Sequence, residues 1–345
     1  MQSTVRTIIV LALAALLVGL FLQNVDLRGV GREILRAEPA WLVFSVTMMF
    51  ANLALRSWRW QYLLEPLGHA GFGSAFRATA VGFAANSLLP ARAGELIRPY
   101  FLARHEQMSA TGAFATIILE RVLDMLTVLV LLAAYVFVFG REMAATNPAA
   151  FGPVKWAGAT AAVASLGVLV VLFVLAGNPA RLREMLERFG RVAPSQLVSL
   201  VARIAEKFAI GLLAVRRPSR LLVALALSLP LWLSISLGIW AVAEAFHLPI
   251  PFFGSFLIMS LLVIGVAVPT PGAVGGFHWA FLFGATTFFG ANEEASVGAA
   301  IVLHVLSFGP SLLLGLLFAA QEGLNIAGMR QLAQQAEPRG DSLVP

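Results

Sequence analysis

Six long apolar runs dominate this sequence and constrain its fold more than any other feature. A helix needs about 20 apolar residues to cross the ~30 Å hydrocarbon core of a bilayer. Hydrophobic residues make up 59% of the 345-residue chain and charged residues 12%, which is too little polar cover for a soluble domain. An all-α, polytopic membrane bundle is therefore predicted. Its full spans are expected at Thr7–Leu22, Ala40–Leu55, Gly112–Phe139, Trp156–Ala176, Leu221–Ala245 and Ser296–Ala319.

The distribution of arginines predicts which ends of the spans face the cytosol. Most basic residues lie in two regions, Arg56–Arg104 and Asn178–Arg220, which the six spans place on the same side. The positive-inside rule puts these regions and both termini in the cytosol, and we predict a bacterial cytoplasmic (inner) membrane. The loop Gln23–Glu38 departs from the rule, because its three arginines fall on the predicted outer side.

Two segments allow a second interpretation. Thr7–Leu22 follows a single arginine, as in a signal peptide, but no small-residue cleavage site stands before Gln23. We therefore interpret it as an uncleaved first span. The segment 178–220 has apolar residues at near-helical spacing, which predicts one or two amphipathic helices on the cytosolic surface. A solvated connector that touches lipid headgroups is the simpler alternative.

Two short stretches rich in proline and glycine interrupt the apolar sequence. The first is Asn86–Arg98 and the second is Pro269–His278. Their apolar flanks, Phe72–Leu89, Phe252–Val268 and Trp279–Phe289, are too short to cross a bilayer comfortably. An irregular backbone survives in hydrocarbon only where protein or trapped water satisfies its amides and carbonyls. Each stretch is therefore predicted to form a re-entrant hairpin beside a polar cavity in the membrane.

The two interrupted regions share one order of features, which indicates an inverted repeat. Each has a Pro/Gly stretch, a polar residue, a short apolar stretch and a long span with a polar residue near its middle. Such units, inserted with opposite polarity, are typical of transporters whose broken helices meet at a substrate site. Chance similarity between apolar segments is the alternative. The predicted helix breaks are Pro90, Gly94, Pro269, Pro271, Gly272, Gly275 and Gly276.

The first Pro/Gly stretch holds candidate ligands for an anionic headgroup. Arg92 and Arg98 present planar guanidinium forks suited to phosphate, and Glu95 between them can orient either one. An amphipathic lipid needs cationic donors beside an apolar path for its tails. The alternative is a cytosolic loop with ordinary anchoring arginines.

The run Gly112–Phe139 contains three charged residues in one helical turn. Glu120 and Asp124 share a helix face, and Arg121 can pair with Asp124. A charge at a helix centre costs about 2.5–3.5 kcal/mol on insertion scales, so these residues should face the bundle interior. An internal ion pair that fixes packing, a functional polar network and a place near the cytosolic headgroups all remain open.

The second Pro/Gly stretch offers backbone amides rather than charges. Gly272, Gly275 and Gly276 free several N–H groups, and a helix beginning at Phe277 would aim its positive end at an anion. His278 is more commonly a hydrogen-bonded packing residue in such surroundings than a proton carrier. We find no metal-ligand spacing, nucleophile elbow, P-loop or dinucleotide fingerprint, and no basic-plus-aromatic run for nucleic acid. No cofactor or metal is therefore expected.

These residues resemble the motifs of a known family. Asn86, Pro90, Arg92, Gly94, Glu95 and Arg98, then Glu120, Arg121 and Asp124, then Pro271, Gly272 and Gly275, are similar to the transmembrane region of lysylphosphatidylglycerol synthases, also named the flippase-like domain. The resemblance covers nearly the whole chain, to about Ala320. The family's second motif usually ends in glutamate, whereas this chain has His278. The resemblance therefore does not imply for His278 any role that requires a carboxylate, such as proton coupling.

The resemblance implies the translocating half of a synthase. In full synthases a cytosolic domain transfers lysine to phosphatidylglycerol, and the membrane region moves the product between leaflets. Without that soluble domain, one flippase-like transmembrane domain is expected over residues 1–320, with the cytosolic amphipathic segment 178–220 between its halves. A polar cytosolic tail is expected over residues 321–345. Stand-alone members have proposed roles in moving lipids, polyprenyl-linked sugars or related amphiphiles.

The sequence thus predicts a non-enzymatic translocase for an anionic or phosphate-bearing lipid, either a membrane phospholipid or a polyprenyl-type lipid. The predicted substrate-binding residues are Asn86, Arg92, Glu95, Arg98, Glu120, Arg121, Asp124 and His278. A membrane subunit that assists a neighbouring lipid- or glycan-modifying enzyme is one alternative. A lipid-phosphate-processing enzyme with Glu120 or Asp124 as general base is another. Glycine-rich spans would also permit a homo-oligomer.

Overall fold

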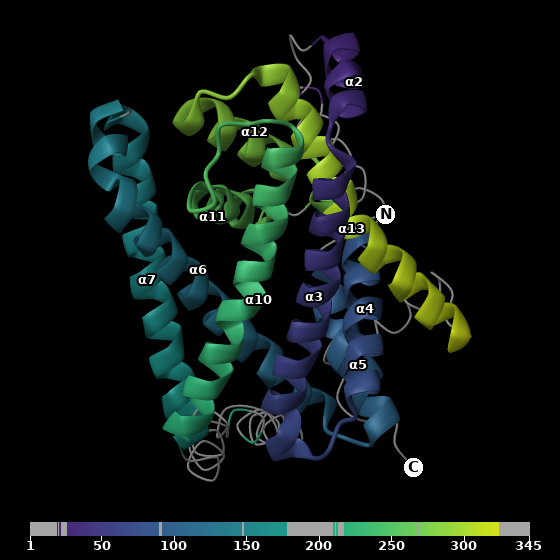
Figure 1. Ribbon diagram of the computed structural model, residues 1–345. Coiled ribbons are helices and arrows are strands. Elements are labelled where there is room, and N and C mark those ends of the chain that lie inside the picture. Colours follow the sequence, from purple (N-terminus) through teal and green to yellow (C-terminus); the bar gives the residue numbers. More distant parts are fainter. Residues whose placement is uncertain are drawn as a thin grey trace, which may run out of the picture.

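The described part of the chain is built from helices (Figure 1). The computed structural model describes residues 26–89, 92–146, 148–177, 217–267 and 270–323, with residues 19, 21, 210 and 212. Within these residues every regular element is helical, which confirms the predicted all-α class. The helices are α2 (Leu27–Arg36), α3 (Pro39–Leu64), α4 (Phe72–Leu88), α5 (Gly94–Glu106), α6 (Ala110–Thr146), α7 (Pro148–Gly177), α10 (Pro218–Ala245), α11 (Gly254–Ala267), α12 (Gly276–Phe289) and α13 (Glu293–Gln321), with 3-10 turns η1 (Glu65–Leu67) and η5 (Pro271–Ala273).

Five described helices, α3, α6, α7, α10 and α13, are long and apolar enough to cross a bilayer. They coincide with five of the six predicted spans, and the number of membrane crossings stays a prediction. The predicted first span, the segment 178–220 and the tail fall almost wholly outside the described residues. Proline in the first turn starts α3 and α10, where its missing N–H costs no hydrogen bond. The helix α3 passes its predicted end at Leu55 and continues to Leu64, because the two arginines that follow Leu55 are neutralised inside the bundle.

Each Pro/Gly stretch connects two short antiparallel helices that pack closely. In the hairpin α4–α5, a Cβ added to Gly94 would collide with the carbonyl oxygen of Gly82. In the hairpin α11–α12, a Cβ added to Gly265 would collide in the same way with the carbonyl oxygen of Gly276. The two helices of each hairpin therefore cross at a pair of glycines, where only a hydrogen atom fits between the two backbones.

The predicted helix breaks lie at the hairpin turns or at the helix starts. Gly94 and Gly276 are the first residues of α5 and α12. Gly272 and Gly275 have φ of 60° and 93°, in the region that favours glycine. Pro271 begins η5. Pro90 and Pro269 lie outside the described residues.

The two halves of the bundle contain the same order of long and short helices, and corresponding helices run in opposite directions. The helices α3–α4–α5–α6 are long, short, short and long, and so are α10–α11–α12–α13. Glu38 N–H donates to the Ala245 carbonyl at 3.0 Å, which joins the start of α3 to the end of α10. The helix α3 packs against its counterpart α10, α13 packs against α4, and α6 packs against α11. The arrangement matches the predicted inverted repeat; the depth of the hairpins in a bilayer stays a prediction.

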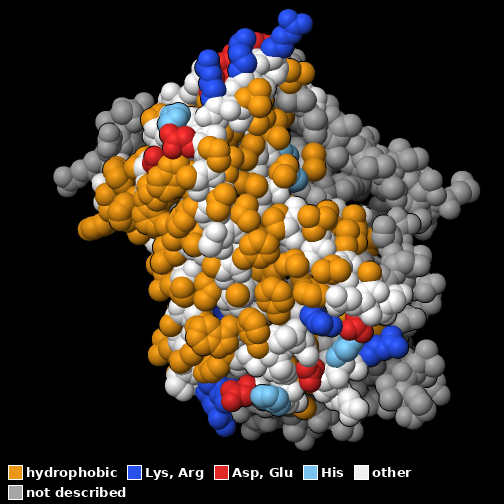
Figure 2. Space-filling model, turned by 45° about the vertical axis from the view of Figure 1, so that its right-hand side comes forward, with side chains coloured by type: hydrophobic (Ala, Val, Ile, Leu, Met, Phe, Trp, Pro, Cys, Tyr) orange, Lys and Arg blue, Asp and Glu red, His pale blue; other side chains and the backbone are white. Residues whose placement is uncertain are grey.

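The surface is apolar in the middle and charged toward its two ends. Figure 2 shows hydrophobic side chains covering the central part of one face, with charged side chains gathered above and below. Large apolar side chains are exposed on α6 and α7, such as Phe137 at 91% and Trp156 at 72% exposure. Soluble proteins rarely expose apolar patches of this extent, whereas lipid tails solvate them. The chain is therefore a polytopic membrane protein.

Candidate functional site

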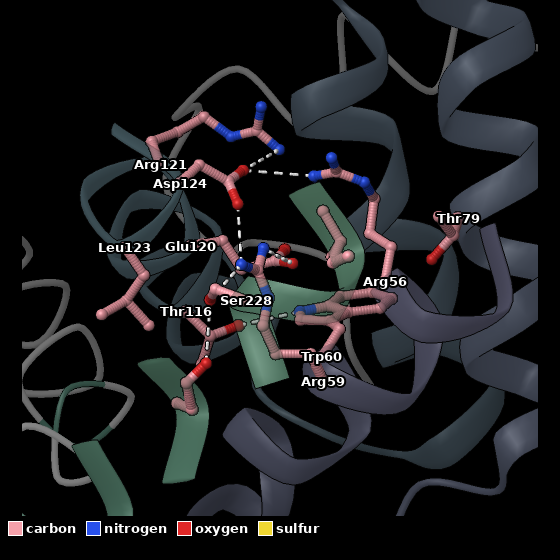
Figure 3. Close-up of polar contacts among 12 residues, drawn as sticks. Arg56, Arg59, Trp60, Thr79, Thr116, Glu120, Arg121, Leu123, Asp124 and Ser228 are labelled. Carbon is pink, nitrogen blue, oxygen red and sulfur yellow. Dashed lines mark hydrogen bonds and ion pairs between the residues drawn. The ribbon is translucent and has the colours of Figure 1, made fainter. Parts of the chain in front are cut away.

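A network of arginines and carboxylates lies buried between α3, α5 and α6. We name it the charged network and define it by Arg56, Arg59, Arg98, Glu120, Arg121 and Asp124. Figure 3 shows Arg56 and Arg59 reaching from α3 toward Glu120 and Asp124 on α6. The side chains of all members except Arg121 are buried.

Asp124 accepts hydrogen bonds from two helices, α3 and α10, and forms an ion pair with an arginine of its own helix. Its Oδ1 accepts Arg59 Nη1 at 2.7 Å and Trp232 Nε1 at 2.9 Å, and its Oδ2 accepts Arg56 Nη1 at 3.2 Å. Arg121 Nη2 lies 3.7 Å from the same Oδ2, so the predicted Arg121–Asp124 pair is present. These charge-assisted bonds replace the water that the carboxylate loses on burial.

Glu120 links α6 to both α3 and α5. Its Oε1 accepts Arg59 Nη2 at 3.0 Å, and its Oε2 accepts Arg98 Nη1 at 2.8 Å. Arg59 also donates to Ser228 Oγ on α10 at 2.7 Å. Because Glu120 and Asp124 lie one helical turn apart, the fork of Arg59 bridges both carboxylates.

Arg98 is held by an aromatic ring as well as by a carboxylate. Its guanidinium carbon lies 3.8 Å from the ring centroid of Trp60, which is cation–π geometry. The indole N–H of Trp60 donates to Thr116 Oγ1 on α6 at 2.9 Å. A Cβ on Gly82 would lie only 2.8 Å from Arg98 Cβ, so the missing side chain lets α5 bring this arginine inward.

Arg92 and Glu95 form a separate pair at the hairpin tips. Arg92 has a positive φ of 55° and is 45% exposed, and its Nη1 lies 3.9 Å from Glu95 Oε1. Its Nη2 donates to the Val266 carbonyl near the end of α11 at 2.9 Å. The first hairpin therefore touches the second. Arg92 contacts Val266 and Glu95, whereas Arg98 contacts Glu120 and Trp60, although both arginines were predicted to hold one phosphate.

Asn86 and His278 lie within the hairpins rather than in the charged network. The Oδ1 of Asn86 is buried beside Gly94 and receives no described donor. His278 Nδ1 accepts the Gly275 N–H at 3.4 Å, and its ring lies 4.6 Å from that of His304. His304 Nε2 lies 2.7 Å from the Gly272 carbonyl oxygen. The second half thus holds two histidine rings on α12 and α13, where the first half holds a charged pair on α5 and α6.

The sequence-based site omitted Arg56, Arg59, Trp60, Ser228 and Trp232. Arg56 and Arg59 were counted only as cytosolic charges, because they follow the predicted end of a span. Their spacing of three residues puts them on one helix face. The absence of a breaker between Leu55 and the Glu65-Pro66 pair was the signal that the helix continues. Among the described residues, no three His, Asp or Glu side chains are placed to hold a metal ion.

Comparison with known proteins gives a family match over most of the chain. The model of the family described as lysylphosphatidylglycerol synthase TM region matches residues 7–315. A UPF0104 membrane protein of Methanothermobacter thermautotrophicus is 25% identical over 290 residues, covering 79% of this chain and 82% of that relative. Glycosyltransferase AglD of Haloferax volcanii is 26% identical over 327 residues, covering 88% of this chain but only 52% of that relative. UPF0104 membrane protein MJ1595 of Methanocaldococcus jannaschii is 25% identical over 122 residues, 34% of this chain and 36% of that relative.

Proposed function

Because this chain belongs to the family of the lysylphosphatidylglycerol synthase transmembrane region, we propose that it moves an anionic or phosphate-bearing lipid between bilayer leaflets without covalent chemistry. The observation that carries this proposal is the charged network, which lies between α5 and two helices, α3 and α6, that are long and apolar enough to span a membrane. A lipid headgroup that leaves water needs polar partners within the bilayer, and its tails need an apolar surface. The chain offers both.

The contact between the hairpin tips supports movement of one half against the other. Arg92 donates to the Val266 carbonyl, and a Cβ on Gly272 would lie 3.7 Å from the Ser87 carbonyl oxygen. In transporters with inverted repeats, alternating access comes from such relative motion around a fixed site. We propose that the tips separate when the headgroup passes.

Cross-linking of the tips is expected to stop lipid movement. The chain contains no cysteine, so Ser87→Cys with Gly272→Cys introduces one reactive pair without background. A short bifunctional methanethiosulfonate should join the pair and lower the transport rate at least tenfold in proteoliposomes. As a control, Ser87→Cys with Thr286→Cys should not cross-link, because Thr286 lies about 15 Å along α12 from its start. Unchanged transport by the joined protein would contradict tip separation.

Transbilayer movement of fluorescent phosphatidylglycerol in proteoliposomes tests the function itself. The parent chain is expected to expose the probe to an external quencher much faster than empty liposomes. Arg98→Lys keeps the charge but loses the planar fork against Glu120 and Trp60, so we expect a reduction of about tenfold or more. Arg28→Gln on exposed α2 is the matched control and should move lipid like the parent. A parent rate no greater than that of empty liposomes would refute the proposal.

A second candidate function rests on the relative named Glycosyltransferase AglD. The match covers nearly all of this chain but about half of that protein, so this chain corresponds to one part of a longer relative. This favours a membrane subunit that assists a glycan-modifying enzyme. Copurification of a stoichiometric enzyme, without lipid movement by the chain alone, would support this alternative.

A lipid-phosphate-processing enzyme is a weaker alternative. Glu120 and Asp124 each accept hydrogen bonds from two guanidinium groups, so both oxygens of each carboxylate already have donors that a substrate proton would have to displace. The bacterial inner membrane and the cytosolic termini remain our predictions; the three relatives named above are archaeal.

A further inference from the structure

The charged network carries more positive than negative charge. Four guanidinium groups surround two carboxylates, and three of these arginines, Arg56, Arg59 and Arg98, are buried. A buried charge without a counterion is strongly unfavourable in surroundings of low dielectric constant. The network as described therefore favours the binding of an additional anion.

The excess charge is accessible at one edge of the network. The side chain of Arg121 is 39% exposed, whereas the other members are at most 6% exposed. Arg56 Nη1 and Arg121 Nη2 both approach Asp124 Oδ2, at 3.2 and 3.7 Å, so the two guanidinium groups are neighbours (Figure 3). The Nε atom of each is buried and lacks a described acceptor.

We propose that Arg56 and Arg121 together bind a phosphate group, that of a lipid headgroup, at this edge. This inference rests on the proposed function and specifies the ligand chemistry of the same network. A phosphate offers several acceptor oxygens in a tetrahedral arrangement, so it can receive N–H donors from two guanidinium forks at once. Asp124 supplies only one oxygen between these forks and leaves donors of both unused.

The surroundings of the pair favour a phosphate that is attached to acyl chains. Arg56 and Arg121 belong to the candidate spans Pro39–Leu67 and Ala110–Gly140. The guanidinium carbon of Arg56 lies 5.6 Å from the ring centroid of Phe83, so apolar groups reach the edge of the site. A free phosphate ion would lose its water here with no apolar contact in return, whereas a lipid keeps its tails in hydrocarbon.

Thermal unfolding of the purified full chain tests this proposal, because Trp60 and Trp232 contact the network and report by fluorescence. Dihexanoylphosphatidylglycerol below its micellar concentration is expected to raise the Tm by about 2–4 °C at a tenfold excess over Kd. Inorganic phosphate and glycerol phosphate at equal concentration should shift it less. An equal shift with inorganic phosphate would contradict the lipid source of the ligand.

Arg121→Gln is the decisive variant, because this side chain is partly exposed and its replacement should leave the fold intact. It is expected to weaken binding of the short-chain lipid at least tenfold, Arg121→Lys should weaken it less, and Arg28→Gln should not change it. The Tm without ligand checks folding. The proposal fails if the lipid raises the Tm of Arg121→Gln as much as that of the parent. It also fails if Arg28→Gln weakens lipid binding as much as Arg121→Gln does.

The outcomes separate this inference from the proposed function. Lipid movement by the parent chain, together with an Arg121→Gln variant that binds the short-chain lipid as tightly as the parent, would overturn the phosphate assignment alone. A parent chain that binds dihexanoylphosphatidylglycerol through Arg121 but moves no lipid would support the assignment and overturn translocation.

Discussion

Asp124→Asn is expected to destabilise the folded chain by about 3–5 kcal/mol, the typical cost of breaking a buried ion pair on one side. Asparagine has the same shape, but it removes the negative charge that Arg56 and Arg59 share and places an N–H₂ group before their donors. The arginines would remain in the bundle without compensation. The measurement is the Tm of the purified protein in detergent, followed by tryptophan fluorescence.

Glu95→Gln is the matched control for this experiment. Glu95 is also a carboxylate near an arginine, but it lies at the hairpin tip, 3.9 Å from a half-exposed Arg92. Exposed pairs of this kind contribute little, so the Tm should stay close to that of the parent. If Asp124→Asn unfolds at the same temperature as Glu95→Gln, the charged network does not hold the helices together.

Gly94→Ala is expected to destabilise the first hairpin by about 1–3 kcal/mol, the usual cost of overpacking a filled site. Alanine is the better helix former, so local propensity alone would predict a gain. The added methyl group, however, would meet the Gly82 carbonyl oxygen, which belongs to backbone and cannot rotate away. Gly265→Ala should have a similar effect in the second hairpin, where the Gly276 carbonyl oxygen blocks the same space.

Gly167→Ala provides the control for both hairpin variants. Gly167 lies in α7, and a Cβ added there would meet nothing within 4 Å. This substitution should leave the Tm unchanged or raise it slightly, because only helix propensity changes. A loss of Tm equal to that of Gly94→Ala would show that the glycine crossing is not the cause.

Much of the helical architecture could be predicted from apolar length and from Pro/Gly placement. A long apolar run is a local property that requires a membrane or a core wherever the chain folds, so five of the predicted spans coincide with helices. The order of long and short elements also indicated the repeat. The same reasoning ended the second span at Leu55, because hydropathy alone treats an arginine as a boundary.

The candidate site could be predicted only in part. The helical spacing of Glu120, Arg121 and Asp124 predicted a shared face for the two carboxylates and an Arg121–Asp124 pair, and the charged network contains both. The pattern Pro-x-Arg-x-Gly-Glu-x-x-Arg selected Arg92 and Arg98 equally, yet only Arg98 joins the charged network. No local feature distinguishes the two, because the difference depends on which residue meets α6 and which meets α11.

The sequence by itself determined that this chain is a membrane bundle with two broken regions, because hydrophobic length and helix breakers act within one segment. Only the tertiary structure decided which charges neutralise one another. Arg59 and Glu120 are 61 residues apart, and Arg59 and Ser228 are 169 residues apart. Such pairs depend on how α3, α6 and α10 pack, and a charge can enter hydrocarbon only where that packing delivers its partner.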